Sequence, residues 1–175
     1  MNKLNLLIII LYFSLLSLIL IVPSLIWKIV KLLININEEI PVYRLLGVET
    51  LTINNPTPLI ITLVIYLIIV LANVYGVILL YKIIQNFKKF QLFEDDVISF
   101  LKQIGYIFIL KYLTLYIIKT VINIPDFIIL TSNTNNLTSY LENSISDVVI
   151  GFFFIVLGNV FEIAKKQKEE NELTI

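Results

Sequence analysis

The residues of this chain that could do chemistry are polar side chains inside long apolar segments. They are Asn73, Lys111, Asn159 and Glu162. A lysine at the centre of a bilayer costs about 2.5 to 3.5 kcal/mol on insertion scales, so Lys111 needs either a route to water or a partner. Such groups have two common uses, which are hydrogen bonds or ion pairs that hold helices together, and a polar path for a transported ion or solute.

Two interpretations of Lys111 stay open. A helical side chain leans toward the N-terminus of its helix, so Lys111 can snorkel toward the end at which its helix begins. Alternatively, Lys111 pairs with Glu162, which leans into the membrane from an antiparallel helix, and one hydrogen-bonded unit then replaces two isolated charges. Asn159 lies one turn from Glu162 on the same helix face, and Asn73 could join the same polar cluster.

The chain contains neither histidine nor cysteine. Their absence removes imidazole and thiolate metal ligands, cysteine nucleophiles, disulfides and the usual general base of a catalytic triad. The apolar segments also lack a second carboxylate that could work with Glu162 as a general acid-base pair. We therefore expect no catalytic residue, no metal site, no cofactor and no enzymatic activity.

Composition indicates the class of protein. Of the 175 residues, 58% are hydrophobic and 15% are charged, and the mean hydropathy is +0.93. Soluble domains have about half apolar and about a quarter charged residues, so this chain is expected to be an integral membrane protein in contact with lipid. The formal net charge is zero. It provides no overall positive field for nucleic acid, and we expect no direct nucleic-acid binding.

Four apolar segments are long enough to cross a hydrocarbon core of about 30 Å as helices. We place these spans at residues 4–27, 59–84, 103–122 and 148–164. Residues 28–58 and 123–147 then form exterior loops, and the first loop contains β-branched residues typical of a short strand or hairpin. Gly151 and Gly158 share one face of the last span, where they allow close helix approach. The predicted fold is all-α, a single transmembrane domain with an up-down bundle of four helices and a small exterior β element.

The connector between the middle spans, residues 85–102, is charged and aromatic. Glu94, Asp95 and Asp96 suit the first turn of a helix that begins near Val97, where negative charge meets the positive end of the helix dipole. Aromatic and basic residues ahead of them suit the membrane surface, with rings in lipid and ammonium groups at phosphates. The candidates for contact with lipid or a cytoplasmic partner are Phe87, Lys88, Lys89, Phe90 and Phe93.

The distribution of basic residues predicts the orientation of the chain. On the connector side of the predicted spans lie Lys3, Lys82, Lys88, Lys89, Lys102, Lys165, Lys166 and Lys168. On the opposite side lie Lys28, Lys31, Arg44 and Lys119. Because basic residues in short loops tend to stay in the cytoplasm, we expect the connector and both termini on the cytoplasmic side.

Three passages carry a resemblance to a known family. They are residues 93–96 (Phe-Glu-Asp-Asp), 101–106 (Leu-Lys-Gln-Ile-Gly-Tyr) and 168–175 (Lys-Glu-Glu-Asn-Glu-Leu-Thr-Ile). Together with the four spans, they make the whole chain similar to the bacterial membrane family known as domain of unknown function 2975. The resemblance implies the cytoplasmic (inner) membrane of a bacterium, and because the family has no assigned activity, it carries over no catalytic residues. Members of this family often sit beside a gene for a small helix-turn-helix repressor, which implies a DNA-binding regulator as partner.

Two functional classes follow from these features. The first is a signalling or regulatory membrane component that acts through a cytoplasmic partner, such as a helix-turn-helix repressor, bound at the connector and the C-terminal tail. The alternative is a small transporter or channel, which would be a homo-oligomer because four helices leave little room for a pore. Its path would use Asn73, Lys111, Asn159 and Glu162.

Overall fold

The four long helices expected from the sequence are present. The computed structural model describes residues 3–34, 57–121 and 144–173. The helices in these ranges are α1 (Lys3–Ile34), α3 (Thr57–Lys88), α4 (Asp95–Val121) and α7 (Ser144–Leu173). Each is long and apolar enough to cross a membrane, so the protein is an all-α, multi-pass membrane protein. The β element expected in the first exterior loop lies outside the described residues.

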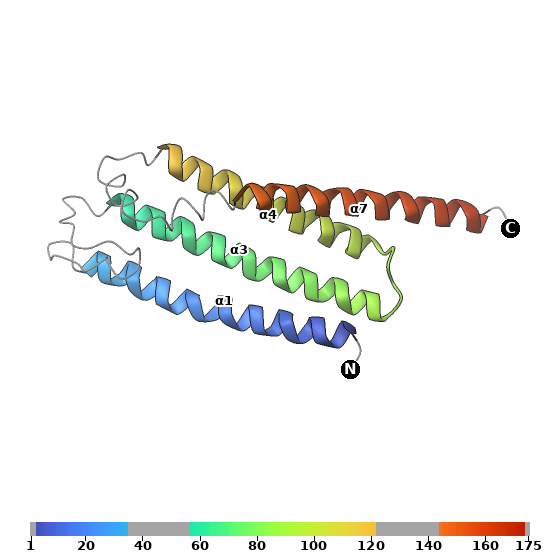
Figure 1. Ribbon diagram of the computed structural model, residues 1–175, viewed down its shortest axis with the longest axis horizontal. Helices are drawn as coiled ribbons and strands as arrows, with labels where there is room; N and C mark the ends of the chain where they lie inside the picture. The colour runs from blue at the N-terminus through green and yellow to red at the C-terminus, as the bar shows by residue number, and fades with distance from the viewer. Residues whose placement is uncertain (1–2, 35–56, 122–143, 174–175) are drawn as a thin grey trace.

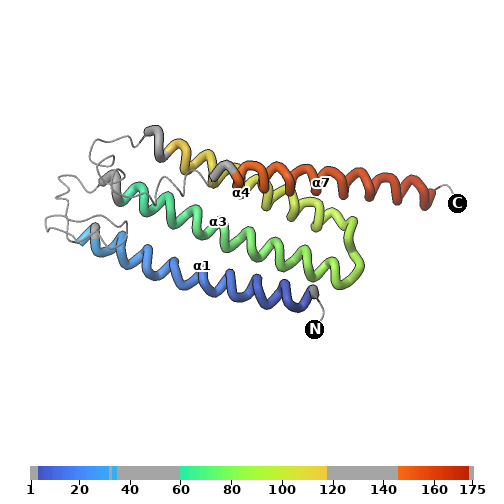
Figure 2. The backbone as a smooth tube through the Cα atoms, viewed as in Figure 1, coloured from blue at the N-terminus to red at the C-terminus, as the bar shows by residue number. Residues whose placement is uncertain are grey.

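The helices run alternately up and down in an elongated bundle (Figure 1). α1 packs on α3, α3 on α4, and α4 on α7, so the order of the helices in space follows their order in the chain. The turn between α3 and α4 lies at the same end of the bundle as both termini (Figure 1), and we call this the connector end. α7 continues past that turn (Figure 2), so its last residues project from the bundle.

The helices are longer than the predicted spans at the connector end. α3 runs to Lys88 and α4 begins at Asp95, so the connector consists of residues 89–94 instead of 85–102. The polar residues outside the apolar spans include good helix formers such as lysine, glutamine and glutamate, which allow each helix to continue beyond the hydrocarbon. The prediction underestimated this extension for α3, whose apolar residues end at position 84, whereas for α4 a helix that begins near Val97 was already expected inside the connector.

The predicted start of α4 is confirmed. Asp95 and Asp96 lie in the first turn, where they complement the positive end of the helix dipole. The carbonyl oxygen of Glu94 accepts hydrogen bonds from the backbone N–H groups of Val97 and Ile98, at 3.0 and 3.2 Å. The three acidic residues thus serve to begin a helix.

The buried core lies where α3 meets α4 and α7. Leu79, Val97 and Ile104 have 0%, 0% and 1% of their surface exposed. Beside them, the rings of Phe108 and Phe154 stack with centroids 6.3 Å apart. Many other large apolar side chains on the four helices are exposed, because lipid can replace protein as their apolar surroundings.

Glycines allow a close contact between α4 and α7. A Cβ atom added to Gly105 would lie 2.6 Å from the carbonyl oxygen of Gly151, and one added to Gly151 would lie 2.8 Å from that of Gly105. Further along α7, a Cβ on Gly158 would lie 2.9 Å from Cγ of Lys102. Gly151 and Gly158 therefore both face α4, which confirms the prediction that they share a packing face.

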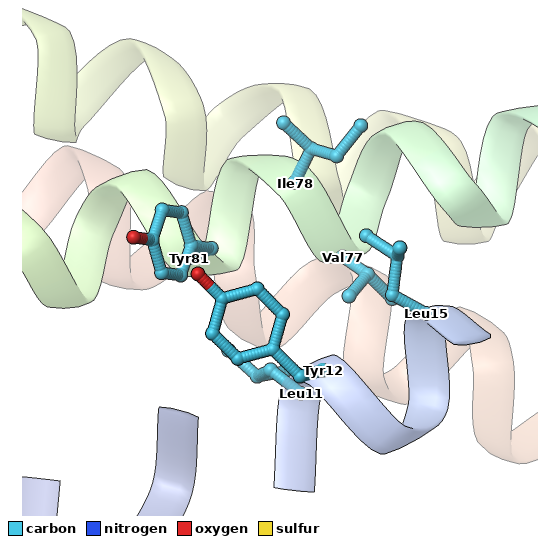
Figure 3. Close-up of a pocket in the computed structure, with 6 residues that line it drawn as sticks. All are labelled: Leu11, Tyr12, Leu15, Val77, Ile78 and Tyr81. Carbon is cyan, nitrogen blue, oxygen red and sulfur yellow. The ribbon is translucent and has the colours of Figure 1, made fainter. Parts of the chain in front are cut away.

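α1 contacts the rest of the bundle through α3. The rings of Tyr12 and Tyr81 lie with centroids 5.5 Å apart, beside a shallow pocket of about 60 Å³ (Figure 3). The pocket is lined by Leu11, Tyr12, Leu15, Val77, Ile78 and Tyr81. None of these six residues is charged, and the polar side-chain groups among them are the hydroxyls of Tyr12 and Tyr81.

Candidate functional site at the connector end

The four polar candidates inside the helices do not form one cluster. The side-chain amide of Asn73 donates a hydrogen bond to the carbonyl oxygen of Ile69 at 2.9 Å, one turn earlier in α3. Asn159 is exposed on α7 and makes no side-chain hydrogen bond to any residue in the described part of the chain. Lys111 and Glu162 both form ion pairs, but with different partners.

Lys111 pairs with Asp147. Its Nζ lies 2.9 Å from a carboxylate oxygen of Asp147, and the two side chains are 27% and 16% exposed. The ring centroid of Phe108 lies 6.0 Å from the same Nζ and adds a cation–π contact. This corrects the expected pairing of Lys111 with Glu162, whereas the contact with Phe108, one turn earlier in α4, agrees with a side chain that leans toward the start of its helix.

The register of α4 against α7 explains the correction. Gly105 faces Gly151, and the helices are antiparallel, so residues after Gly105 lie level with residues before Gly151. Lys111 and Asp147 are brought level in this way. Glu162 lies on the other side of Gly151, about 16 Å of helix rise toward the connector end, and is out of reach of Lys111.

The sequence did contain a signal for Asp147. Small residues mark the places where helices approach closely, and a Gly105–Gly151 contact places Asp147, four residues before Gly151, within reach of the long Lys111 side chain, six residues after Gly105. The predicted last span began at residue 148, which assigned Asp147 to a loop. In the structure, Asp147 lies in the first turn of α7.

Two other ion pairs join α4 to α7 at the connector end. Nζ of Lys102 lies 2.7 Å from Glu162, and Nζ of Lys165 lies 2.6 Å from Asp95. Lys166 adds a second ammonium group at 3.7 Å from Glu162. Because the side chains of Glu162 and Asp95 are 42% and 85% exposed, water competes for both pairs and their contribution to stability is small. Their main effect is to hold α7 at a defined place beside the start of α4.

The three phenylalanines around the connector do not share one role. Phe87 and Phe93 pack against Phe161 of α7, with ring centroids 6.4 and 5.6 Å apart. Phe90 points away from the protein and is 91% exposed. The short turn between α3 and α4 thus brings Phe87 and Phe93 onto α7, whereas Phe90 has no such contact, and Phe93 remains 36% exposed.

Phe90 has a strained backbone. α3 ends with two hydrogen bonds of a Schellman motif, from the N–H of Gln91 to the oxygen of Asn86 at 3.0 Å and from the N–H of Phe90 to that of Phe87 at 3.2 Å. The residue at the position of Phe90 in this motif adopts a left-handed conformation and is usually glycine. Phe90 has a φ of 59°, which costs a residue with a Cβ atom about 1 to 2 kcal/mol.

Two lysines lie next to Phe90. Nζ of Lys88 donates a hydrogen bond to the side-chain oxygen of Asn5 at 2.8 Å, which ties the end of α3 to the start of α1. Lys89 is exposed. We call Lys88, Lys89 and Phe90 the connector tip. Of the five connector candidates, these three lie at the outer end, whereas Phe87 and Phe93 attach the connector to α7 through their contacts with Phe161.

We expect Phe90→Gly to raise the free energy of unfolding by about 1 kcal/mol, because glycine adopts positive φ without strain. Unfolding in mixed detergent micelles, followed by circular dichroism, measures this change. The matched control is Gln91→Gly at the next position, where the backbone is not left-handed and glycine should lower stability. A loss of stability in Phe90→Gly equal to that in Gln91→Gly would contradict the strain.

Comparison with known proteins gives one match. The family described as Protein of unknown function (DUF2975) matches residues 2–175. No curated protein and no solved structure matches the chain. The matched range includes the four described helices and the connector, so the family model covers the connector tip as well as the bundle.

Proposed function

Since the chain belongs to the DUF2975 family, whose description names no activity, we propose from its geometry that it is a regulatory membrane protein that binds a cytoplasmic partner at its connector end. The binding surface consists of the connector tip and the projecting end of α7. The partner is a soluble regulator, such as a helix-turn-helix repressor. The observation that carries the proposal is the exposed and strained Phe90.

Phe90 combines two properties that favour contact of its ring with a partner. A ring that is 91% exposed makes almost no contact with the rest of the chain, so the free energy that burial of an aromatic side chain provides is available to a partner that covers it. Its left-handed backbone adds strain that glycine would not have. Strained residues concentrate at functional sites, and aromatic side chains dominate the binding energy of protein interfaces. The strain is offset if a partner covers the ring.

The contacts of α7 connect this surface to the membrane-spanning part of the protein. Phe93 packs on Phe161, and Asp95 pairs with Lys165, so the connector is attached to α7 on both sides of Glu94. α7 in turn packs along α4 through the glycine contact. A change in the position of α7 within the membrane would therefore move the connector tip, as a protein that reports a membrane state to a soluble partner requires.

The orientation is part of the proposal. The connector end carries the larger share of the lysines, and this distribution favours the cytoplasm for the connector tip and both termini. The family resemblance favours the inner membrane of a bacterium. In this orientation the connector tip and the projecting end of α7 are accessible to a cytoplasmic regulator.

A small oligomeric transporter is the weaker alternative. It requires polar side chains that line a shared path through the membrane. The side chain of Asn73 makes a hydrogen bond within its own helix, and Asn159 is exposed on α7. Lys111 and Glu162 pair with different residues, and they lie at different depths of the contact between α4 and α7. The positions of these four residues therefore support the regulatory proposal better than transport.

Binding to a helix-turn-helix regulator encoded beside its gene, which the family resemblance leads us to expect, tests the proposal. The full chain in lipid vesicles is floated through a density gradient with the purified regulator, and the bound fraction is measured. We expect Phe90→Ala to weaken binding about tenfold or more, because loss of an interface aromatic typically costs more than 1 kcal/mol. The matched control is Trp27→Ala, which removes a ring that is 70% exposed at the opposite end of the bundle. Equal binding by the two variants, or no binding by the unchanged chain, contradicts the proposal.

A further inference from the structure

The outer face of α7 carries an exposed stripe with heptad spacing. Its members alternate at intervals of three and four residues, and they are Val149, Phe152, Val156, Asn159 and Ile163. The apolar members Val149, Phe152, Val156 and Ile163 are 64%, 56%, 57% and 57% exposed. This spacing is the one by which two helices form a left-handed packing seam. The opposite face of α7, with Gly151 and Gly158, packs on α4.

Asn159 distinguishes this stripe from an ordinary lipid-facing surface. It lies about 9 Å of helix rise from Lys165, on the membrane side of that residue. Its side chain is exposed and makes no hydrogen bond within the described ranges. Lipid tails offer no donor or acceptor, and Asn159 does not bond to its own helix as Asn73 does, so a neighbouring helix is the source that would satisfy both its donor and its acceptor. The apolar neighbours gain no hydrogen bond from a partner, but Asn159 does.

We propose that two copies of this protein pair through their α7 helices along the stripe, with the Asn159 side chains hydrogen-bonded to each other. An asparagine amide both donates and accepts, so it is complementary to itself. Insertion gives every copy the same orientation in the membrane, and a two-fold axis normal to the membrane then places the two Asn159 side chains at the same depth. Asparagine at a single position of a helical seam also specifies register and the number of helices.

The arrangement of the bundle leaves this face available to a second copy. α7 packs on α4, whereas α1 packs on α3 at the other side of the bundle (Figure 1). The stripe ends after Ile163, because the next position in the spacing is Lys166, whose side chain is 69% exposed. The pairing is therefore confined to the apolar part of α7. It does not depend on the connector tip or on the proposed regulator.

Cysteine cross-linking tests this pairing directly, because the natural chain has no cysteine. Val156→Cys places one thiol in the middle of the stripe and leaves Asn159 in place. The control Leu20→Cys places a thiol near the middle of α1 on a surface that is 67% exposed. The full chain is oxidised in lipid vesicles at a low protein-to-lipid ratio, and the disulfide-linked dimer is measured on a non-reducing gel. We expect several-fold more dimer from Val156→Cys than from Leu20→Cys.

A second pair of variants tests the role of Asn159. In the Val156→Cys chain, Asn159→Leu should lower the cross-linked fraction several-fold, whereas Asn159→Gln should retain most of it. Position 159 is exposed, so leucine there should leave the thermal unfolding of the single bundle in detergent unchanged. Equal cross-linking of Val156→Cys and Leu20→Cys would overturn the pairing. Cross-linking that Asn159→Leu does not reduce would overturn the hydrogen-bonded seam.

Discussion

Gly105→Ala is expected to lower the free energy of unfolding by about 2 to 3 kcal/mol, because a Cβ at this position overpacks the contact between α4 and α7. The added atom would lie 2.6 Å from the carbonyl oxygen of Gly151 and 2.6 Å from Cγ1 of Ile155. The backbone oxygen cannot rotate away as a side chain can, so the helices must separate. Unfolding in mixed detergent micelles measures the loss.

Two other glycines provide graded controls for this prediction. At Gly158 the nearest atom to an added Cβ is Cγ of the flexible Lys102 side chain, at 2.9 Å, so alanine should cost less than at Gly105. At Gly76 the nearest atom is Cδ1 of Ile107, at 3.8 Å, which is an ordinary contact. Alanine at Gly76 should be neutral or stabilising. The same loss of stability in all three variants would show that α4 and α7 do not meet at Gly105.

Lys111→Met is expected to lower the free energy of unfolding by about 3 kcal/mol, because it leaves the carboxylate of Asp147 without its partner in an apolar setting. Asp147→Asn should cost a similar amount by leaving the ammonium group unpaired. The two side chains are 27% and 16% exposed, so water can replace only part of what each loses. The same detergent unfolding experiment measures both variants.

The double variant Lys111→Met with Asp147→Asn should recover most of the stability lost in each single variant, because it removes both charges together. The matched control is Lys165→Met at the other end of α7, where the partner Asp95 is 85% exposed and the loss should be small. Additive losses in the double variant would contradict the ion pair. Recovery of stability in the double variant supports a structural role for Lys111, in which its ion pair holds α4 against α7. A transport path does not require such a role.

The prediction of individual helices was reliable where local signals were strong. Apolar segments of sufficient length identified all four helices, and the acids at 94–96 identified the start of α4. Gly151 and Gly158 were recognised as a packing face because small side chains leave room for a neighbouring backbone. Each of these inferences depends on neighbouring residues in the chain or on the general geometry of a helix.

The prediction of contacts between helices was less successful, and the reason is the apolar surroundings. In water, an apolar stripe identifies the face that packs inside a protein. In lipid, leucine is equally well accommodated against protein or against acyl chains, so the pattern does not show which face meets a neighbour. Apolar residues are spread almost evenly around α3 and α4, so Phe87 and Phe90 could not be separated by pattern alone.

Residue types alone indicated a multi-pass membrane protein, with long apolar helices in the ranges that the structure describes and a charged connector at the same end as both termini. Length and hydropathy suffice for that result, because each helix satisfies its own backbone hydrogen bonds in lipid. The packed bundle was needed to show that Lys111 meets Asp147 and that Asn159 faces outward. Those features depend on the register and rotation of α7 against α4, which are set by packing at Gly105 and Gly151 and not by hydropathy.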